Sequence, residues 1–89
     1  MSYTVLILPA ARRALAALPK AERARVDEHI VALATNPRPV GAIPLKGEGR
    51  GLWRIRVGDY RILYQIRHRE LEVVVVDIGH RRNIYRSHA

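Results

Sequence analysis

A tight hairpin centred on Gly58 and Asp59 constrains the fold of this chain more than any other sequence feature. Residues 52–57, LWRIRV, and residues 60–67, YRILYQIR, both alternate between apolar and polar side chains. Such alternation is typical of half-buried strands, and a two-residue link with glycine first is typical of the tightest antiparallel turns. The segment therefore predicts two neighbouring antiparallel strands with one buried face.

The length of this turn also predicts the register of the two strands. Trp53 is expected opposite Tyr64, and Arg56 is expected opposite Arg61. Because side chains alternate between the faces of a strand, one face should be apolar and pack on helices. That face carries Trp53, Ile55, Val57, Tyr60, Ile62 and Tyr64. The opposite face, named here the arginine face, carries Arg54, Arg56 and Arg61. A bulge at Gly58 would move Arg61 to the other side and remove this cluster.

The remaining segments predict an α+β domain that spans residues 1–89. We expect a buried strand at 3–8, helices at 10–18 and about 19–35, and a long Pro- and Gly-rich loop at 36–51. The β-branched residues 71–78 predict a central strand that Gly79 ends. The order β-α-α-β-β-β predicts a helical hairpin on one face of a mostly antiparallel four-stranded sheet. The C-terminal tail is expected to be irregular or to form a short helical turn.

The arginine face places like charges close together. Arginines directly opposite each other on neighbouring strands destabilise a sheet by about 0.2–1 kcal/mol. A cluster of three indicates an anionic ligand that neutralises it. The alternative is a solvated face on which the arginines separate and pair with Asp59, Glu70 or Glu72.

Composition supports a polyanionic partner and excludes several kinds of chemistry. The chain carries 16 basic residues against 8 acidic ones, a formal charge of +8, and 14 of the basic residues are arginine. The arginine guanidinium binds phosphate oxygens in pairs, although a GC-rich genome would also enrich arginine and alanine. The absence of cysteine excludes disulfides and thiolate sites, and the histidine spacing predicts no metal site. Without a basic leader or a long apolar stretch, we expect a cytoplasmic protein with no membrane contact.

A second group of polar residues follows the last strand, in the segment GHRRNIYR. A tyrosine there could stack on an RNA base or take part in proton transfer. The alternative is that Ile84 and Tyr85 hold the C-terminus against the core. The candidate residues of this segment are His80, Arg81, Arg82, Tyr85 and Arg86. The glycine-rich KGEGRG, residues 46–51, lacks the continuation of a phosphate loop and is interpreted as a flexible loop beside the site.

These segments together resemble RelE-like toxins of type II toxin–antitoxin systems, within the RelE/ParE superfamily. The resemblance covers nearly the whole chain. It rests on ARRALAALP, NPRP with PLKG, WRIRVGDYRILYQI and VVVVDIGHRRNIYR. The last two, at this spacing, are the most specific.

The resemblance implies a metal-independent endoribonuclease that cleaves mRNA in the ribosomal A site and needs no cofactor. In that family the RNA 2′-hydroxyl attacks the adjacent phosphate and leaves a cyclic phosphate. The family's catalytic positions match Arg54, Arg56, Arg61, Arg81 and Tyr85. The best-studied pattern has lysine at the first two, and because arginine keeps its proton, neither can act as a base. We expect the arginines to stabilise charge on the phosphate, and Tyr85 or His80 to transfer protons. Additional RNA contacts are expected from Lys46, Arg50, Arg82 and Arg86.

The resemblance also implies partners and leaves two other functions open. The expected partner is an acidic, RelB-like antitoxin that lays an amphipathic helix across the helices and the arginine face. Operator DNA would be bound only through that antitoxin. The first alternative is a ParE-like inhibitor of DNA gyrase that acts by binding. The second is a catalytically silent member of the family.

Overall fold

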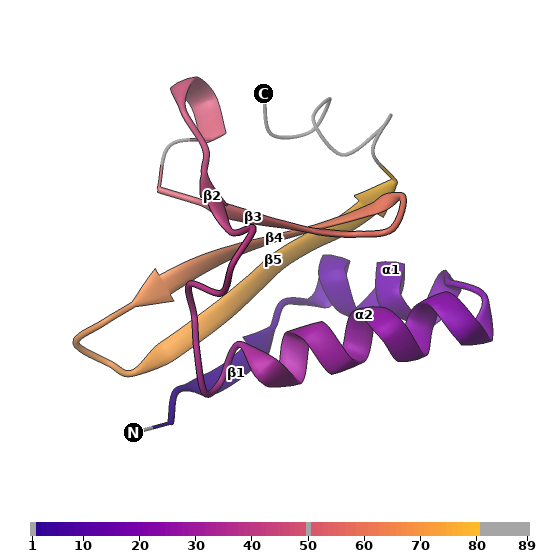
Figure 1. The fold of residues 1–89 in the computed structure, drawn as a ribbon, viewed down its shortest axis with the longest axis horizontal. Helices are drawn as coiled ribbons and strands as arrows, with labels where there is room; N and C mark the ends of the chain where they lie inside the picture. Colours follow the sequence, from indigo (N-terminus) through magenta and orange to yellow (C-terminus); the bar gives the residue numbers. More distant parts are fainter. Residues whose placement is uncertain (1, 50, 81–89) are drawn as a thin grey trace.

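The computed structural model describes residues 2–49 and 51–80. Two helices lie together on one side of a twisted sheet (Figure 1). The elements in chain order are β1 (Thr4–Ile7), α1 (Pro9–Ala17), α2 (Lys20–Ala32), β2 (Ile43–Pro44), the 3₁₀ turn η1 (Gly47–Gly49), β3 (Trp53–Val57), β4 (Tyr60–Arg67) and β5 (Glu72–His80). The predicted α+β class is confirmed.

Within the described residues, the sheet has five strands in the order β1-β5-β4-β3-β2, one more than the sequence predicts. Only the pairing of β1 with β5 is parallel. The extra strand, β2, is two residues long and pairs Ile43 with Arg54 and Pro44 with Trp53. The prediction of four strands was wrong because β2 lies inside the Pro- and Gly-rich loop, and proline is tolerated on an edge strand.

The helices are delimited by proline, as the sequence predicts. Pro9 occupies the first turn of α1, where its missing amide hydrogen costs no helical hydrogen bond, and Pro19 precedes α2. The residues of the two helices with 2% exposure or less are Ala11, Val26 and Ile30, and Leu33, directly after α2, is also fully buried. They pack against the apolar face of the sheet and form one continuous core with it.

The predicted hairpin register is confirmed at every pair. Trp53 lies opposite Tyr64, Ile55 opposite Ile62, and Arg56 opposite Arg61. Gly58 has a φ of +59°, the backbone conformation that this kind of turn requires at its first central position. No bulge interrupts the pairing of β3 with β4, so the three arginines of the arginine face share one side of the sheet.

The pairing of β4 with β5 contains an irregularity that the sequence did not predict. Leu63 pairs with Asp77, but the next residue, Tyr64, pairs with Val75, so Val76 is an extra residue in β5. The inward positions of β5 are therefore Val73, Val75 and Ile78, which are all buried in the core. The strand also continues through Gly79 to His80, which corrects the predicted end at Gly79.

The long loop is held against the sheet by Tyr64. Its hydroxyl donates a 2.7 Å hydrogen bond to the carbonyl oxygen of Pro37. The guanidinium carbon of Arg38 lies 5.8 Å from the ring centroid of Trp53, within cation–π range. These contacts bring the loop beside β3 and allow β2 to pair there. In the described part of the chain, no helix has the length and apolar character to cross a membrane.

Candidate nucleic-acid interface

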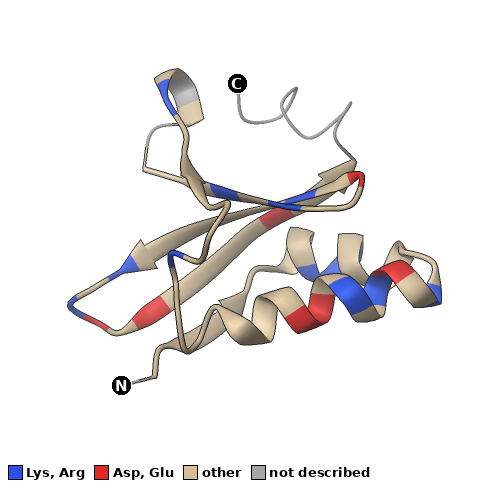
Figure 2. Cartoon of the chain, in the orientation of Figure 1, with Lys and Arg blue, Asp and Glu red and all other residues tan. Residues whose placement is uncertain are grey.

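The arginine face lies on the side of the sheet away from the helices. Arg54 and Arg56 project from β3, and Arg61 projects from β4. Blue segments mark these basic positions on the two strands in Figure 2. Because all three side chains leave the same side of a sheet whose other side is fully packed, the positive charge is directed away from the core.

Arg61 is the most constrained of the three. Arg61 is buried, with only 8% of the residue exposed. One terminal nitrogen, Nη1, donates a 3.3 Å hydrogen bond to the Tyr60 carbonyl oxygen. Within the described residues its Nε is buried and makes no hydrogen bond. A buried charged group without full compensation costs free energy, and the cost is relieved when an anion binds.

Gly79 lies opposite Arg61 on the neighbouring strand β5. The row across the sheet therefore runs Arg56, Arg61, Gly79, with no side chain at its third position. A glycine inside a strand weakens the strand but permits close approach of another group. The structure thus places two guanidinium groups in one row with a residue that has no side chain.

Arg56 is exposed and bends toward the turn. Its Nε donates a 3.2 Å hydrogen bond to the carbonyl oxygen of Gly58. Neither Arg56 nor Arg61 forms an ion pair with a carboxylate among residues 2–49 and 51–80. For Arg56 and Arg61, the alternative in which the arginines pair with Asp59, Glu70 or Glu72 is not observed.

Glu70 and Glu72 are instead used at the far end of the sheet. Both lie near Arg67, at 3.7 Å and 3.6 Å between nitrogen and oxygen. Arg67 lies at the opposite end of β4 from Arg61. Glu70 and Glu72 therefore lie toward the end of the sheet away from Arg61, where they do not screen the charge of the arginine face.

Asp77 shares the arginine face, which the sequence did not predict. It lies in a cross-strand row with Leu63 and Arg54. Strict alternation from Val75 would have directed Asp77 into the core, and the extra residue Val76 reverses its direction. One carboxylate oxygen of Asp77 accepts a 2.8 Å hydrogen bond from the backbone amide of Ile78. The sequence does not predict this bulge, because the run VVVV is uniform.

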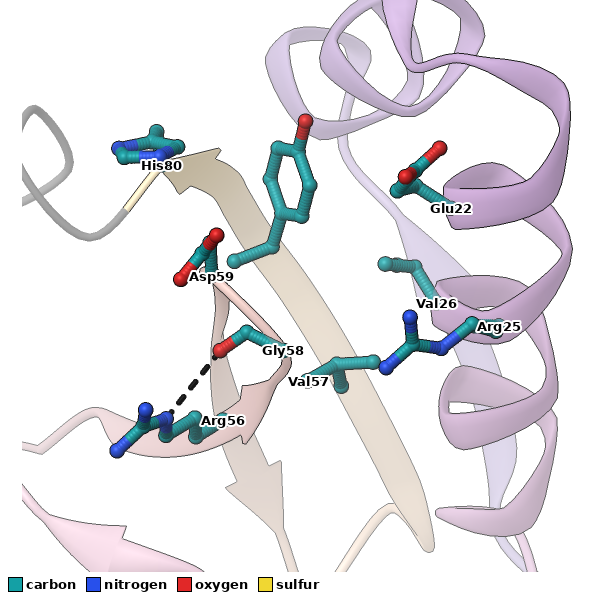
Figure 3. A pocket seen from close by; sticks show the side chains of 9 residues that line it. Glu22, Arg25, Val26, Arg56, Val57, Gly58, Asp59 and His80 are labelled. Carbon is teal, nitrogen blue, oxygen red and sulfur yellow. Dashed lines mark hydrogen bonds between the residues drawn. The ribbon is translucent and has the colours of Figure 1, made fainter.

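A cleft opens where the turn of the hairpin faces α2. It has a volume of about 360 Å³, and Figure 3 shows Glu22 and Arg25 on the helix side and Arg56 and Asp59 on the hairpin side. This hairpin cleft is lined by Glu22, Arg25, Val26, Arg56, Val57, Gly58, Asp59, Tyr60 and His80. Arg56 belongs to both the cleft and the arginine face, so the two surfaces meet at its side chain.

Sequence comparison assigns the family. The family model described as the ParE toxin of type II toxin–antitoxin system, parDE, matches residues 5–85. This chain belongs to the RelE/ParE superfamily of toxins. A curated relative, Toxin RelG of Mycobacterium tuberculosis, is 40% identical to it over 87 residues. That alignment covers 97% of this toxin and 99% of RelG.

Solved structures agree with this assignment. The toxin-antitoxin complex RelBE2 from Mycobacterium tuberculosis contains a chain that matches the toxin with a TM-score of 0.81 and 34% identity, over 90% of this chain and 99% of that one. The archaeal RelE-RelB complex from Pyrococcus horikoshii matches with a TM-score of 0.80 and 31% identity, over 93% and 99%. The expected RelE-like fold is thereby confirmed.

The other predicted site residues of the toxin are separated from the arginine face or lie outside the described residues. His80 pairs with Tyr60, with ring centroids 5.8 Å apart, and therefore faces the cleft side of β5 rather than Arg61. Lys46 is exposed directly before η1. The predicted residues outside the described ranges are Arg50, Arg81, Arg82, Tyr85 and Arg86. Among the described residues, no cluster of potential ligands could hold a metal ion.

Proposed function

We propose that this toxin is a ribosome-dependent endoribonuclease that cleaves mRNA in the A site and thereby stops translation. The observation that supports it most is the buried Arg61, which lies beside Arg56 with no carboxylate partner among the described residues. A phosphodiester is the anion that such a pair of guanidinium groups binds well, because two nitrogens can contact two phosphate oxygens at once.

The proposed reaction is an internal transfer at phosphorus. The RNA 2′-oxygen forms a bond to the adjacent phosphorus while the bond to the 5′-oxygen of the next nucleotide breaks. The products are a 2′,3′-cyclic phosphate and a 5′-hydroxyl. One proton leaves the 2′-hydroxyl and one is delivered to the departing 5′-oxygen, so the step needs no metal or external cofactor.

The arginines have an electrostatic role in this proposal. Negative charge on the phosphate oxygens grows in the transition state, and fixed positive groups stabilise it most strongly where water is scarce. Arg61, which is buried, fits this role, with Arg54 and Arg56 beside it. Arginine does not lose its proton at working pH, so none of the three is the general base.

Proton transfer is assigned to Tyr85, with His80 as the alternative, although His80 faces the opposite side of the sheet from Arg61. Tyr85 and the additional phosphate contact Arg81 lie outside the described residues. His80 lies next to Tyr60 on the cleft side. If RNA cleavage survived in both His80→Ala and Tyr85→Phe, this assignment of the proton-transfer group would be wrong.

The proposed partner is an acidic, RelB-like antitoxin. Two relatives were solved as complexes with such proteins. An acidic segment lying on the arginine face would neutralise the charges of Arg56 and Arg61 and would exclude RNA. The complex would bind operator DNA through the antitoxin, not through this chain.

Expression of the toxin alone tests the proposed nuclease. We expect growth arrest and mRNA 5′ ends at reproducible positions within codons, mapped by primer extension. Arg61→Ala should abolish these ends, whereas Arg69→Ala should retain them, because Arg69 lies in the exposed turn between β4 and β5. Intact mRNA together with loss of DNA supercoiling would instead support the alternative of a ParE-like gyrase inhibitor; the matching family model is that of the ParE toxin. Intact mRNA, normal supercoiling and normal growth would indicate a silent toxin.

A further inference from the structure

Of the residues that line the hairpin cleft, the reaction proposed above uses Arg56 and His80 and leaves the others without a role. The floor of the cleft is apolar, because Val26 is fully buried and Val57 is 5% exposed. Its walls carry two aromatic rings, Tyr60 and His80. A volume of about 360 Å³ falls within the range of roughly 300–1,000 Å³ that is typical of small-molecule sites.

A carboxylate is available inside this cleft. Glu22 is half-buried in the first turn of α2 and projects toward the hairpin (Figure 3). Within residues 2–49 and 51–80 it forms no ion pair, although Arg25 lies one helical turn away. A carboxylate accepts hydrogen bonds only, so its complement is a group with two adjacent donors.

The rings of Tyr60 and His80 line the cleft without stacking on each other. Tyr60 and His80 meet edge to face, at 85° between ring planes and 5.8 Å between centroids. In that arrangement the rings do not stack on each other, so one of them keeps both faces uncovered by its neighbour. Unpaired RNA bases are recognised by stacking on such rings together with hydrogen bonds to their edges.

Arg56 connects the cleft to the arginine face. It lines the cleft, and its Nε is held by the Gly58 carbonyl oxygen. Its terminal nitrogens can therefore contact a phosphate at the boundary between the two surfaces. Arg56 therefore joins the surface proposed for the phosphate to the cleft.

From these observations we propose that the hairpin cleft binds one unpaired nucleobase of the RNA strand held on the arginine face, with guanine preferred through Glu22. Guanine presents two adjacent N–H donors on its pairing edge, which match one carboxylate, whereas uracil presents one. This inference rests on the proposed function and adds a specificity site to it.

Nucleotide binding tests the cleft without requiring cleavage. GMP, AMP, CMP and UMP are titrated separately into the purified toxin, and the backbone amide of Gly58 is followed by NMR. We expect GMP to bind about fivefold more tightly than UMP, the lower end of what a bidentate base contact provides. Glu22→Gln should remove the difference between the two nucleotides. Glu28→Gln, an exposed change on the same helix outside the cleft, should retain it.

Cleavage mapping then separates this inference from the proposed function. On ribosomes, the wild-type toxin should show guanine enriched beside the cut, and Glu22→Gln should cut with that enrichment lost. Equal binding of the four nucleotides, unchanged by Glu22→Gln, would overturn the cleft inference even if cleavage continued. A guanine preference in binding without any cleavage would refute the proposed function and leave the cleft inference standing. If Glu22→Gln weakened only antitoxin binding, the cleft would be a protein contact and the inference would be wrong.

Discussion

At the scale of single residues, Tyr64 combines two tasks in one side chain. Its ring is fully buried in the core, and its hydroxyl donates a hydrogen bond to the Pro37 carbonyl oxygen in the long loop. Because that loop continues into β2, which pairs with β3 at Arg54, Tyr64 helps to place the edge of the sheet that carries the arginine face.

Removing this hydroxyl should destabilise the protein measurably. We expect Tyr64→Phe to lower the free energy of unfolding by about 1–3 kcal/mol, because it leaves a carbonyl oxygen without its partner. Urea denaturation followed by Trp53 fluorescence would measure the change. Tyr3→Phe is the matched control, since the Tyr3 hydroxyl contacts His68 at 3.3 Å in an exposed position. Equal effects of the two substitutions would show that the Tyr64 hydrogen bond contributes no more to stability than the exposed contact of Tyr3.

The same tyrosine predicts a loss of stability at high pH. Burial raises the pKa of Tyr64 from 10.0 to about 12, against a smaller lowering by the Arg38 charge. Above pH 10 the unfolded chain releases this proton while the folded protein keeps it, so unfolding becomes more favourable as pH rises from 10 to about 12. Below pH 10 the contribution is fully present. Unfolding free energies measured at intervals across this range should fall, and Tyr64→Phe should show a shallower fall.

At the scale of elements, the β3–β4 hairpin depends on Gly58. Its φ of +59° is unfavourable for residues with a Cβ atom. A Cβ added there would lie 3.3 Å from a terminal nitrogen of Arg25, so the turn also lies close against α2.

Gly58→Ala should therefore destabilise the hairpin. We expect a loss of about 1–2 kcal/mol in unfolding free energy from the left-handed backbone conformation alone. Thermal unfolding followed by circular dichroism would detect the change. Asp59→Ala changes the other central residue of the turn, which does not have a positive φ, and should cost less. A larger effect at Asp59 would mean that the side chain, rather than the glycine backbone, stabilises this turn.

The bulge in β5 also determines which side chains reach the candidate site. By adding Val76, it keeps Val75 and Ile78 in the core and directs Asp77 to the arginine face. A bulge re-aims side chains in this way at many functional sites. The two carboxylates of β5 are Glu72 and Asp77. The bulge places Asp77 in the same cross-strand row as Arg54.

At the scale of the whole molecule, the chain has a formal net charge of +8. Figure 2 shows basic segments on the strands of the arginine face and also along the helices, where acidic segments lie among them. All charged residues of β3 and β4 are basic, with Asp77 of β5 beside them, so this part of the sheet has a positive field. Such a field accelerates encounter with a polyanion and makes binding sensitive to salt.

The affinity for single-stranded RNA should follow this charge. If Arg54, Arg56 and Arg61 each contact one phosphate, the logarithm of the binding constant should fall with the logarithm of salt concentration at a slope of about −2, from roughly 0.7 per contact. Arg61→Gln should make the slope shallower by about 0.7. Fluorescence anisotropy of a labelled oligonucleotide at several salt concentrations provides the measurement. An unchanged slope in Arg61→Gln would exclude a phosphate contact at Arg61.

Local patterns in the sequence determined most of the architecture. Pro9 and Pro19 delimit the helices, and the two-residue turn at Gly58 sets the register that gathers the three arginines. These features are readable because their causes, a missing amide hydrogen and a restricted turn geometry, act within a few residues.

Only the tertiary structure decided the pairing of β2, the direction of Asp77, the burial of Arg61 and the cleft between Glu22 and the hairpin. Each depends on contacts between segments far apart in the chain. Four consecutive valines can form a buried strand in either register. The packing of Tyr64 and Ile78 therefore determines the position of the bulge. The strand pairing and the side-chain directions described above are stabilised by burial against residues that are distant in the sequence. No local pattern of side chains predicts them.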